Sequence, residues 1–389
     1  MKTNATNFQA TARLQGKSLL AWRSAQLVLL AVGLCIFLAL IFFPDIGHHA
    51  LWNVLISAAP LLFVLIPGIW RNICPLATVA MLPHHLNLSR KKRLPVKWLG
   101  RLDLAGVALL FLIVPVRHVL LDSDPQATAV TLALLGAAAL ASGVLFDSKS
   151  AWCSSLCPVY PVEKLYGQRP LVTVANAHCA QCRNCVNPCP DSTPGTNLAT
   201  GSQSKPRRMA ASLLVGGLPG FIWGWFHVRD YGSAAGLREW LIAFGLPWGT
   251  MLLSLAAFLL LRGWLGEKRE PHLVRMSAAA AVSCYYWYRL PAMIGFGLFP
   301  EQGTLVDLTH LVPAWSVMLV QAAVVAFFGW WLVLRKPAPA VWALRPPFAV
   351  GPKAVAVSVP ARRNESLDQP ASCFTHASED ESARRPVLS

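Results

Sequence analysis

The chain has 389 residues, of which 55% are hydrophobic and only 13% are charged, and its formal net charge is +16. This composition is typical of a membrane protein and excludes an ordinary soluble globular domain. The basic residues gather between long apolar runs, with Arg90, Lys91, Lys92 and Arg93 as the densest group. We therefore predict that the positive charge faces anionic lipid headgroups, and we predict no nucleic-acid partner.

Runs of about 17–25 predominantly apolar residues are long enough to cross a bilayer as helices. We expect an all-α polytopic membrane protein with about eight such helices. They are predicted at Leu19–Phe43, Ala50–Trp70, Leu104–Leu121, Ala127–Phe146, Met209–His227, Leu241–Leu265, Leu273–Phe299 and His310–Leu334. The first run is longer than the apolar part of a signal peptide and lacks a small-residue cleavage site, so we expect it to be retained.

The lysines and arginines predict the orientation. With eight crossings, one face receives both termini and every basic residue except Arg117, Arg229, Arg238 and Arg289. Positively charged segments stay on the cytoplasmic side of a membrane. We therefore expect a multi-pass protein of the bacterial inner (cell) membrane with both termini in the cytoplasm.

Four regions are predicted along the chain. An N-terminal four-helix membrane region covers 1–146, a small cytoplasmic cysteine loop covers 147–208, and a C-terminal four-helix membrane region covers 209–335. The remaining residues, 336–389, are rich in proline, alanine, serine and charge and lack a sustained apolar period. That composition predicts a disordered tail.

The cytoplasmic region carries a run of four cysteines, Cys179, Cys182, Cys185 and Cys189, followed by a proline. The spacing C-x2-C-x2-C-x3-C-P is the run that holds a [4Fe–4S] cluster in bacterial ferredoxins. Zinc is the weaker interpretation, because zinc sites typically pair two short cysteine knuckles across a longer spacer. The reducing cytoplasm also favours thiols and metal ligands over disulfides.

A weak internal repeat precedes this run. The second apolar run leads from Trp70 into Cys74 and a proline, and the fourth leads into Cys153 and then Cys157 and a proline. Aligning the two Cys-Pro pairs puts Trp70 at the position of Cys153. We expect two helical hairpins that present Cys-Pro corners to one aqueous face and frame a cluster. Cys153 and Cys157 are four residues apart and share a helix face if that segment is helical.

With these motifs the chain resembles the membrane-bound polyferredoxins typified by the NapH and NosR proteins, together with the CcoG-type proteins of oxidase assembly. NapH serves periplasmic nitrate reduction and NosR serves nitrous-oxide reduction. The resemblance covers about residues 50–200. It implies that cytoplasmic clusters pass electrons between the quinone pool or cytoplasmic donors and partner redox proteins. Such proteins usually carry two ferredoxin runs and two complete corners, whereas this chain has one run and one and a half corners.

The ligand count leaves two assignments open. In the simpler one, a single [4Fe–4S] cluster is bound by the run itself. In two-cluster ferredoxins, however, the fourth cysteine of a run binds the other cluster. Cys189 and the corner cysteines would then serve a second, incompletely cysteine-ligated cluster, so Cys153, Cys157 and Cys74 are also predicted cofactor ligands. Cys153 and Cys157 can equally form a metal clip or a redox-active pair.

Histidines gather on the opposite face. His118, His227 and His310 are candidates for a quinone site, because histidine titrates in the range that quinol oxidation requires. His118 with His227 or His310 is also a candidate axial pair for a b-type haem. The alternative is that these histidines are polar end caps in the headgroup region. Arg289, within the seventh run, is either a functional residue of such a site or a side chain that snorkels to the interface.

The predicted function is electron transfer between the quinone pool or a cytoplasmic donor and a partner redox protein. We expect a component of a redox system more than a stand-alone enzyme, and no catalytic residue is assigned. Two other interpretations stay open: a metal-handling or assembly factor for a respiratory oxidase or reductase, and a membrane redox sensor. The sequence contains neither a CxxCH motif for covalent haem nor a GxGxxG nucleotide fingerprint.

Overall fold

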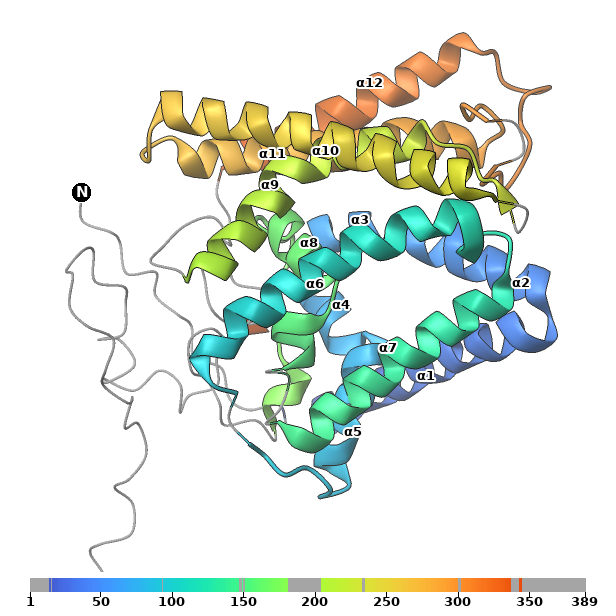
Figure 1. Ribbon diagram of the computed structural model, residues 1–389. Coiled ribbons are helices and arrows are strands. Elements are labelled where there is room, and N and C mark those ends of the chain that lie inside the picture. The colour runs from blue at the N-terminus through green and yellow to red at the C-terminus, as the bar shows by residue number, and fades with distance from the viewer. Residues whose placement is uncertain are drawn as a thin grey trace, which may run out of the picture. The chain divides into compact units, whose positions relative to one another are not determined.

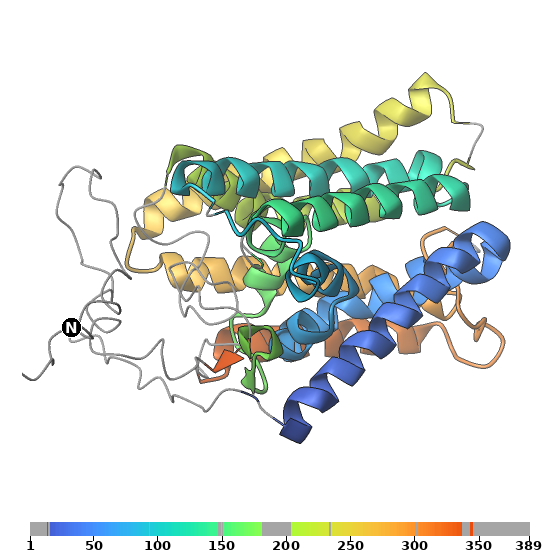
Figure 2. The same ribbon diagram turned by 90° about the horizontal axis from the view of Figure 1, so that it is seen from below.

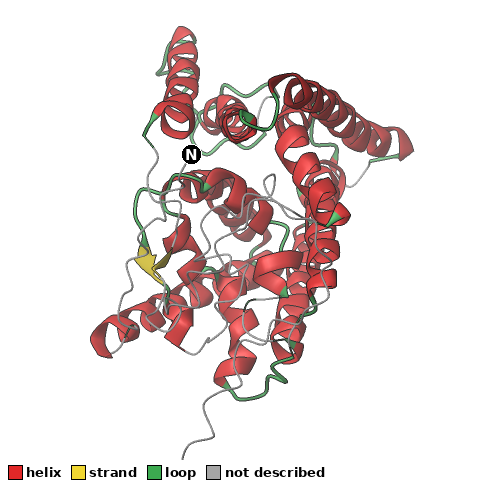
Figure 3. Cartoon of the chain, turned by 90° about the vertical axis from the view of Figure 1, so that its left-hand side faces the viewer, coloured by secondary structure: helices red, strands yellow, loops and turns green. Residues whose placement is uncertain are grey.

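The computed structural model describes residues 14, 16–92, 94–146, 149, 151–180, 204–232, 235–299, 302–336 and 343–344. The chain divides into the units Met1–Ala349 and Val350–Ser389, and every described residue belongs to the first. Helices make up most of that unit (Figure 3). Together with their apolar composition, this confirms the predicted all-α polytopic membrane fold.

The first half of the unit contains two long hairpins and a series of short helices. In chain order the helices are α1 (Gly16–Phe42), α2 (Pro44–His48), η1 (His49–Leu55), α3 (Ile56–Leu65), α4 (Pro67–Ile73), α5 (Pro75–His85), α6 (Val96–Val116), η2 (Arg117–Leu121), α7 (Pro125–Leu145), η3 (Trp152–Leu156), α8 (Tyr160–Tyr166) and η4 (Ala177–Ala180). Figure 1 shows α6 and α7 diverging from η2, so that α7 lies beside α1 and α6 lies toward the later helices.

The second crossing begins and ends earlier than expected. It runs from Pro44 to Leu65 and then breaks at Ile66, whose backbone lies outside the helical region at φ −134° and ψ 48°. The residue before a proline is disfavoured in the helical conformation, and Pro67 follows directly. The break frees the carbonyl of Leu65, which accepts a hydrogen bond of 2.7 Å from the backbone N–H of Leu171. The predicted run Ala50–Trp70 is therefore two separate helices at this end.

The second half contains α9 (Lys205–Phe226), α10 (Leu237–Leu265), α11 (Glu270–Met293), α12 (Trp315–Gly329) and η6 (Trp330–Leu334). Helix α9 packs against α10 and α6, and α11 packs against both α9 and α12 (Figures 1 and 2). The largest apolar core joins the two halves, because it contains Phe63 of α3, Phe111 of α6, Phe221 of α9 and Tyr286 of α11.

Seven helices among the described residues are long and apolar enough to span a membrane, against the eight expected. The predicted span Leu273–Phe299 corresponds to α11, which ends at Met293 and is absent from the seven. Much of α11 is buried against protein, and it carries Glu270 and Arg289 in buried positions. Because α11 is surrounded largely by protein and not by lipid, it can carry more polar side chains than a lipid-facing helix.

A short strand follows the last helix. Strand β2 (Ala343–Leu344) pairs in parallel with β1 (Val174–Ala175). This pairing lies within 336–389, the region predicted as a disordered tail, and the other residues of that region after Lys336 lie outside the described part of the chain.

Candidate metal centre

The two predicted Cys-Pro corners share one backbone conformation. Cys74 has φ −54° and ψ 123°, and Cys157 has φ −61° and ψ 121°. Each residue ends a short helix and precedes a proline that disfavours further helix at the cysteine. The equivalence supports the internal repeat, although the first corner is followed by the eleven-residue helix α5 and the second by the seven-residue helix α8.

The corner cysteines come together in one apolar cluster. Cys153 lies in its buried core with Trp152, and Cys74 and Cys157 are partly buried against that core. None of the three forms a disulfide within the described part of the chain. Cys153 lies in the π-helix η3, and Cys157 follows the last residue of that helix. The predicted gathering of the corners at one place is thus present in the fold.

Two glycines allow the corners to approach the long helices. A Cβ atom on Gly106 of α6 would lie 2.7 Å from the carbonyl oxygen of Ser155 and 3.1 Å from that of Leu156, both in η3. A Cβ atom on Gly143 of α7 would meet the backbone carbonyl of Ala80 in α5. Side chains at these positions would push η3 and α5 away, so α6 and α7 hold the two corners through backbone contact.

A buried ion pair connects the segments on either side of the thiols. Arg71, at the end of α4, donates from Nη1 to Oε2 of Glu163 in α8 at 2.8 Å. Trp70 donates from Nε1 to the other carboxylate oxygen at 2.7 Å. Arg71 also donates to the carbonyl oxygen of Cys153 at 3.2 Å. Glu163 therefore ties the first corner to the helix that follows the second.

Burial and this carboxylate control the state of the corner thiols. Burial raises the pKa of Cys157 well above its ordinary value, and the negative charge of Glu163 raises it further. The same two causes, in the same order, raise the pKa of Cys74. Without metal both groups are neutral thiols, which are poor nucleophiles toward soluble partners. A bound cation would reverse this effect, since thiolates are the metal-binding form.

The entry of the ferredoxin run lies against the first corner. Asn72, two residues before Cys74, donates from Nδ2 to the carbonyl oxygen of Ala175 at 3.1 Å and accepts at Oδ1 from the N–H of Ala177 at 3.0 Å. Ala177 begins helix η4, which includes the backbone of Cys179. The predicted ligands Cys182, Cys185 and Cys189 lie outside the described residues. Within the described ranges no group of three or more His, Cys, Asp or Glu side chains is placed to hold a metal ion.

Sequence reasoning missed the residues that hold these segments together. Asn72, Arg71 and Glu163 flank the cysteine motifs, and Gln26 comes from the middle of α1. In the sequence, three of them are visible as polar residues near the Cys-Pro pairs, and Gln26 is visible as an amide within an apolar run. Apart from Arg23, their partners lie between 46 and 152 residues away in the chain, so the pairing was not readable from spacing.

The opposite end of the helices carries a second group of polar residues. Both ring nitrogens of His118 face acceptors: Nδ1 lies 2.6 Å from Oδ1 of Asp230, and Nε2 lies 3.1 Å from the carbonyl oxygen of Trp225. Each ring nitrogen therefore already has a protein oxygen within hydrogen-bonding distance. In this arrangement His118 has no free nitrogen for the iron of a haem. His227 stacks on Trp223 at 3.9 Å between ring centroids, and His310 is exposed.

Arg289 belongs to the same end and does not snorkel. It is 4% exposed and donates to Oγ of Ser57 at 2.7 Å and to Oδ1 of Asn53 at 2.8 Å. Nearby, Nε of Arg117 donates a hydrogen bond to Oδ1 of Asp122 at 2.9 Å, and the same oxygen lies 3.5 Å from Nε2 of His48. The structure thus brings His118 and Arg289 into a buried polar region, with His310 outside it.

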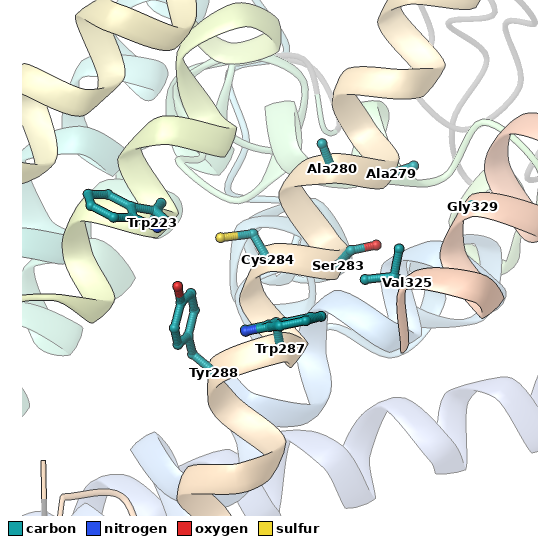
Figure 4. A pocket seen from close by; sticks show the side chains of 9 residues that line it. All are labelled: Trp223, Ala279, Ala280, Ser283, Cys284, Trp287, Tyr288, Val325 and Gly329. Atoms are coloured by element: carbon teal, nitrogen blue, oxygen red, sulfur yellow. The ribbon is translucent and has the colours of Figure 1, made fainter. Parts of the chain in front are cut away.

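A groove of about 370 Å³ lies between α9, α11 and α12. Figure 4 shows its lining, in which Trp223, Trp287 and Tyr288 surround Cys284. Small residues, including Ala280 and Gly329, complete the lining. The lining of the groove is mostly apolar.

Comparison of the chain with protein-family models, with curated proteins and with solved structures finds no match in any of the three.

Proposed function

We propose that this protein is an inner-membrane electron-transfer protein that binds a [4Fe–4S] cluster. Its ligands are Cys179, Cys182, Cys185 and Cys189, and the corner cysteines are the next ligands. When bound, the cluster takes up and passes on single electrons. The ligand set fits such a group, because thiolates are the ligands of cubane iron–sulfur clusters.

The observation that supports the proposal is that the two Cys-Pro corners meet in one cluster and that the segment leading into the ferredoxin run is bonded beside the first of them. Cys74 and Cys157 pack against Cys153, and Asn72 bonds to the segment that begins the ferredoxin run. The surrounding apolar residues and the Arg71–Glu163 pair limit the access of water to the corner thiols. Thiols shielded in this way are better suited to a resident group than to exchange with soluble partners.

The donor or acceptor on the membrane side is proposed to be a quinone. A bilayer core about 30 Å thick is too wide for one cytoplasmic cluster to cross, so a mobile carrier or a partner subunit must complete the route. The groove beside Cys284 offers aromatic walls for a quinone ring, with the hydroxyl of Tyr288 as a hydrogen-bonding group. A partner redox protein and a cytoplasmic orientation of the cysteine loop complete this proposal.

A second candidate function is metal handling during assembly of a respiratory oxidase or reductase. It is favoured by the presence of three cysteines, Cys74, Cys153 and Cys157, in one cluster. If this function is correct, replacing Cys153 and Cys157 by serine abolishes maturation of the partner while the spectrum of the cluster in the run survives. An electron relay through a single cluster predicts that partner maturation is unaffected.

The test is anaerobic purification with quantification of iron, sulfide, zinc and haem, followed by EPR before and after reduction. Four irons per chain without haem support one cluster, and seven or eight support a second cluster at the corners. Cys182→Ser, at a ligand common to both assignments, is expected to abolish the signal. Stoichiometric zinc with no iron would overturn the proposal.

A further inference from the structure

The entry of the cysteine run is bound to the fold by a buried amide. Asn72 is 1% exposed and uses both ends of its side chain on one short segment, with Nδ2 bonded to Ala175 and Oδ1 bonded to Ala177. Asn72 thus pairs with one backbone carbonyl and one backbone N–H, the two groups with which a neighbouring strand would pair. Asn72 therefore fixes the position and the direction of the chain immediately before Cys179.

Asn72 is in turn held by a side chain of α1. Gln26 of α1 is 2% exposed and donates from Nε2 to the backbone carbonyl of Asn72 at 2.9 Å. The same nitrogen lies 3.4 Å from Nε2 of His178, which is buried next to Cys179 in the sequence. Arg23 donates to Oε1 of Gln26 at 3.1 Å. Three segments, α1, α4 and η4, thus meet at one amide.

We propose that Asn72, supported by Gln26, is the positioning residue that holds the segment leading into the ferredoxin run against α4, next to the first Cys-Pro corner. This inference rests on the proposed function, because the run is positioned for a cluster. Asn72 precedes Cys74 by two residues, and the bonded Ala177 precedes Cys179 by two residues. The clamp therefore fixes the backbone that leads into Cys179 relative to the backbone that leads into Cys74.

Exact placement of ligands matters because outer hydrogen bonds orient the groups that bind a metal. Loss of such partners typically weakens metal binding by about 10–100-fold. A loosened entry also admits water, and water stabilises the more negatively charged reduced cluster. The variant Asn72→Ala is therefore expected to release iron to a chelator about tenfold faster than the unaltered protein. Its cluster is expected to show a more positive midpoint potential and a broadened EPR signal.

The experiment compares Asn72→Ala, Gln26→Leu and a control in the full-length protein. The control is Thr128→Val, which removes a buried hydrogen bond of 2.7 Å to the carbonyl of Leu121 at the other end of the helices. We expect both clamp variants to change iron release and potential, and the control to match the unaltered protein. Unchanged potential and release in both clamp variants would overturn the inference, as would equal changes in the control.

Amide hydrogen exchange across residues 175–180 supplies a readout that needs no iron. The N–H of Ala177 is expected to be protected in the unaltered protein and to lose that protection in Asn72→Ala. If the unaltered protein holds no iron, the proposed function fails, and loss of this protection still establishes the clamp. If the protein holds iron and the exchange of Ala177 is the same in both, the clamp is wrong and the proposed function stands.

Discussion

Arg71 and Glu163 form an ion pair between the two Cys-Pro corners, with 2.8 Å between Nη1 and Oε2 and side-chain exposures of only 6% and 3%. The carboxylate is also bonded to Trp70, and the guanidinium to the carbonyl of Cys153. Both charges are thus taken out of water and depend on each other and on these neutral groups.

Removal of one member of this pair is expected to be severe. Arg71→Met leaves the carboxylate of Glu163 buried without its cation, at a cost of about 3–5 kcal/mol of folding free energy. The double variant Arg71→Met with Glu163→Leu removes both charges and should recover most of that loss. Unfolding in detergent, followed by tryptophan fluorescence, measures both. Equal stability of the single and the double variant would contradict the prediction.

The close approach of η3 to α6 predicts a sharp difference between two glycines. Gly106→Ala places a methyl group against the carbonyl of Ser155 and should destabilise the protein by about 1–3 kcal/mol. Gly136→Ala in α7 meets nothing within 4 Å and should leave the stability unchanged or raise it by about 0.5–1 kcal/mol. Thermal unfolding of the two variants side by side is the measurement. Unchanged stability in Gly106→Ala would show that η3 yields without cost, and an equal loss in Gly136→Ala would show that the contact with η3 is not its cause.

The thiol of Cys157 makes the metal-free protein sensitive to alkali. Its pKa is raised in the folded state by burial and by Glu163, so its contribution to stability is complete below the unfolded-state pKa of about 8.5. As the pH rises above that value, the unfolded thiol ionises while the folded thiol does not, and stability falls. Between about pH 8 and pH 10, the free energy of unfolding measured by denaturation should therefore fall more in the unaltered protein than in Cys157→Ser. Parallel curves for the two would refute this contribution.

Asp122 is expected to make the stability of the protein depend on pH in the acidic range. Burial opposes its ionisation, but hydrogen bonds and positive charge from His48 and Arg117 hold its pKa well below the usual value. The resulting stability is present above the unfolded-state pKa of about 3.9 and is lost as the pH falls through the lower folded value. Asp122→Asn should therefore lose stability at neutral pH and show less further loss below about pH 4 than the unaltered protein. Acid unfolding followed by circular dichroism decides this.

The sequence was sufficient for the crossings and for the corners. Helices such as α1 and α10 carry their own signal, because each is a long apolar run with no partner needed to recognise it. The Cys-Pro corners were also readable, since proline limits the backbone of the residue before it. Predictions that fall on Cys182, Cys185 and Cys189 stay predictions, as do the cluster, the quinone and the family resemblance.

The sequence was insufficient where a feature depends on distant partners. Helix α11 looked like one more apolar span, yet its buried Arg289 is accommodated by Ser57 and Asn53, more than 230 residues earlier. The pairing of Asn72 with Ala177 and of Arg71 with Glu163 has the same origin. Such contacts follow from packing of the finished fold and leave no periodic trace in the chain.

The parallel pairing of β1 with β2 has a consequence for biosynthesis. Val174 pairs with Ala343, and Ala175 pairs with Leu344, directly before the helix that opens the cysteine run. The ribosome makes α9 through η6 between these partners. The edge of the cysteine loop therefore stays open while the last helices enter the membrane, and it closes only after residue 344 has been translated. There is thus an interval during synthesis in which the cysteine loop has been made but β1 does not yet have its partner β2.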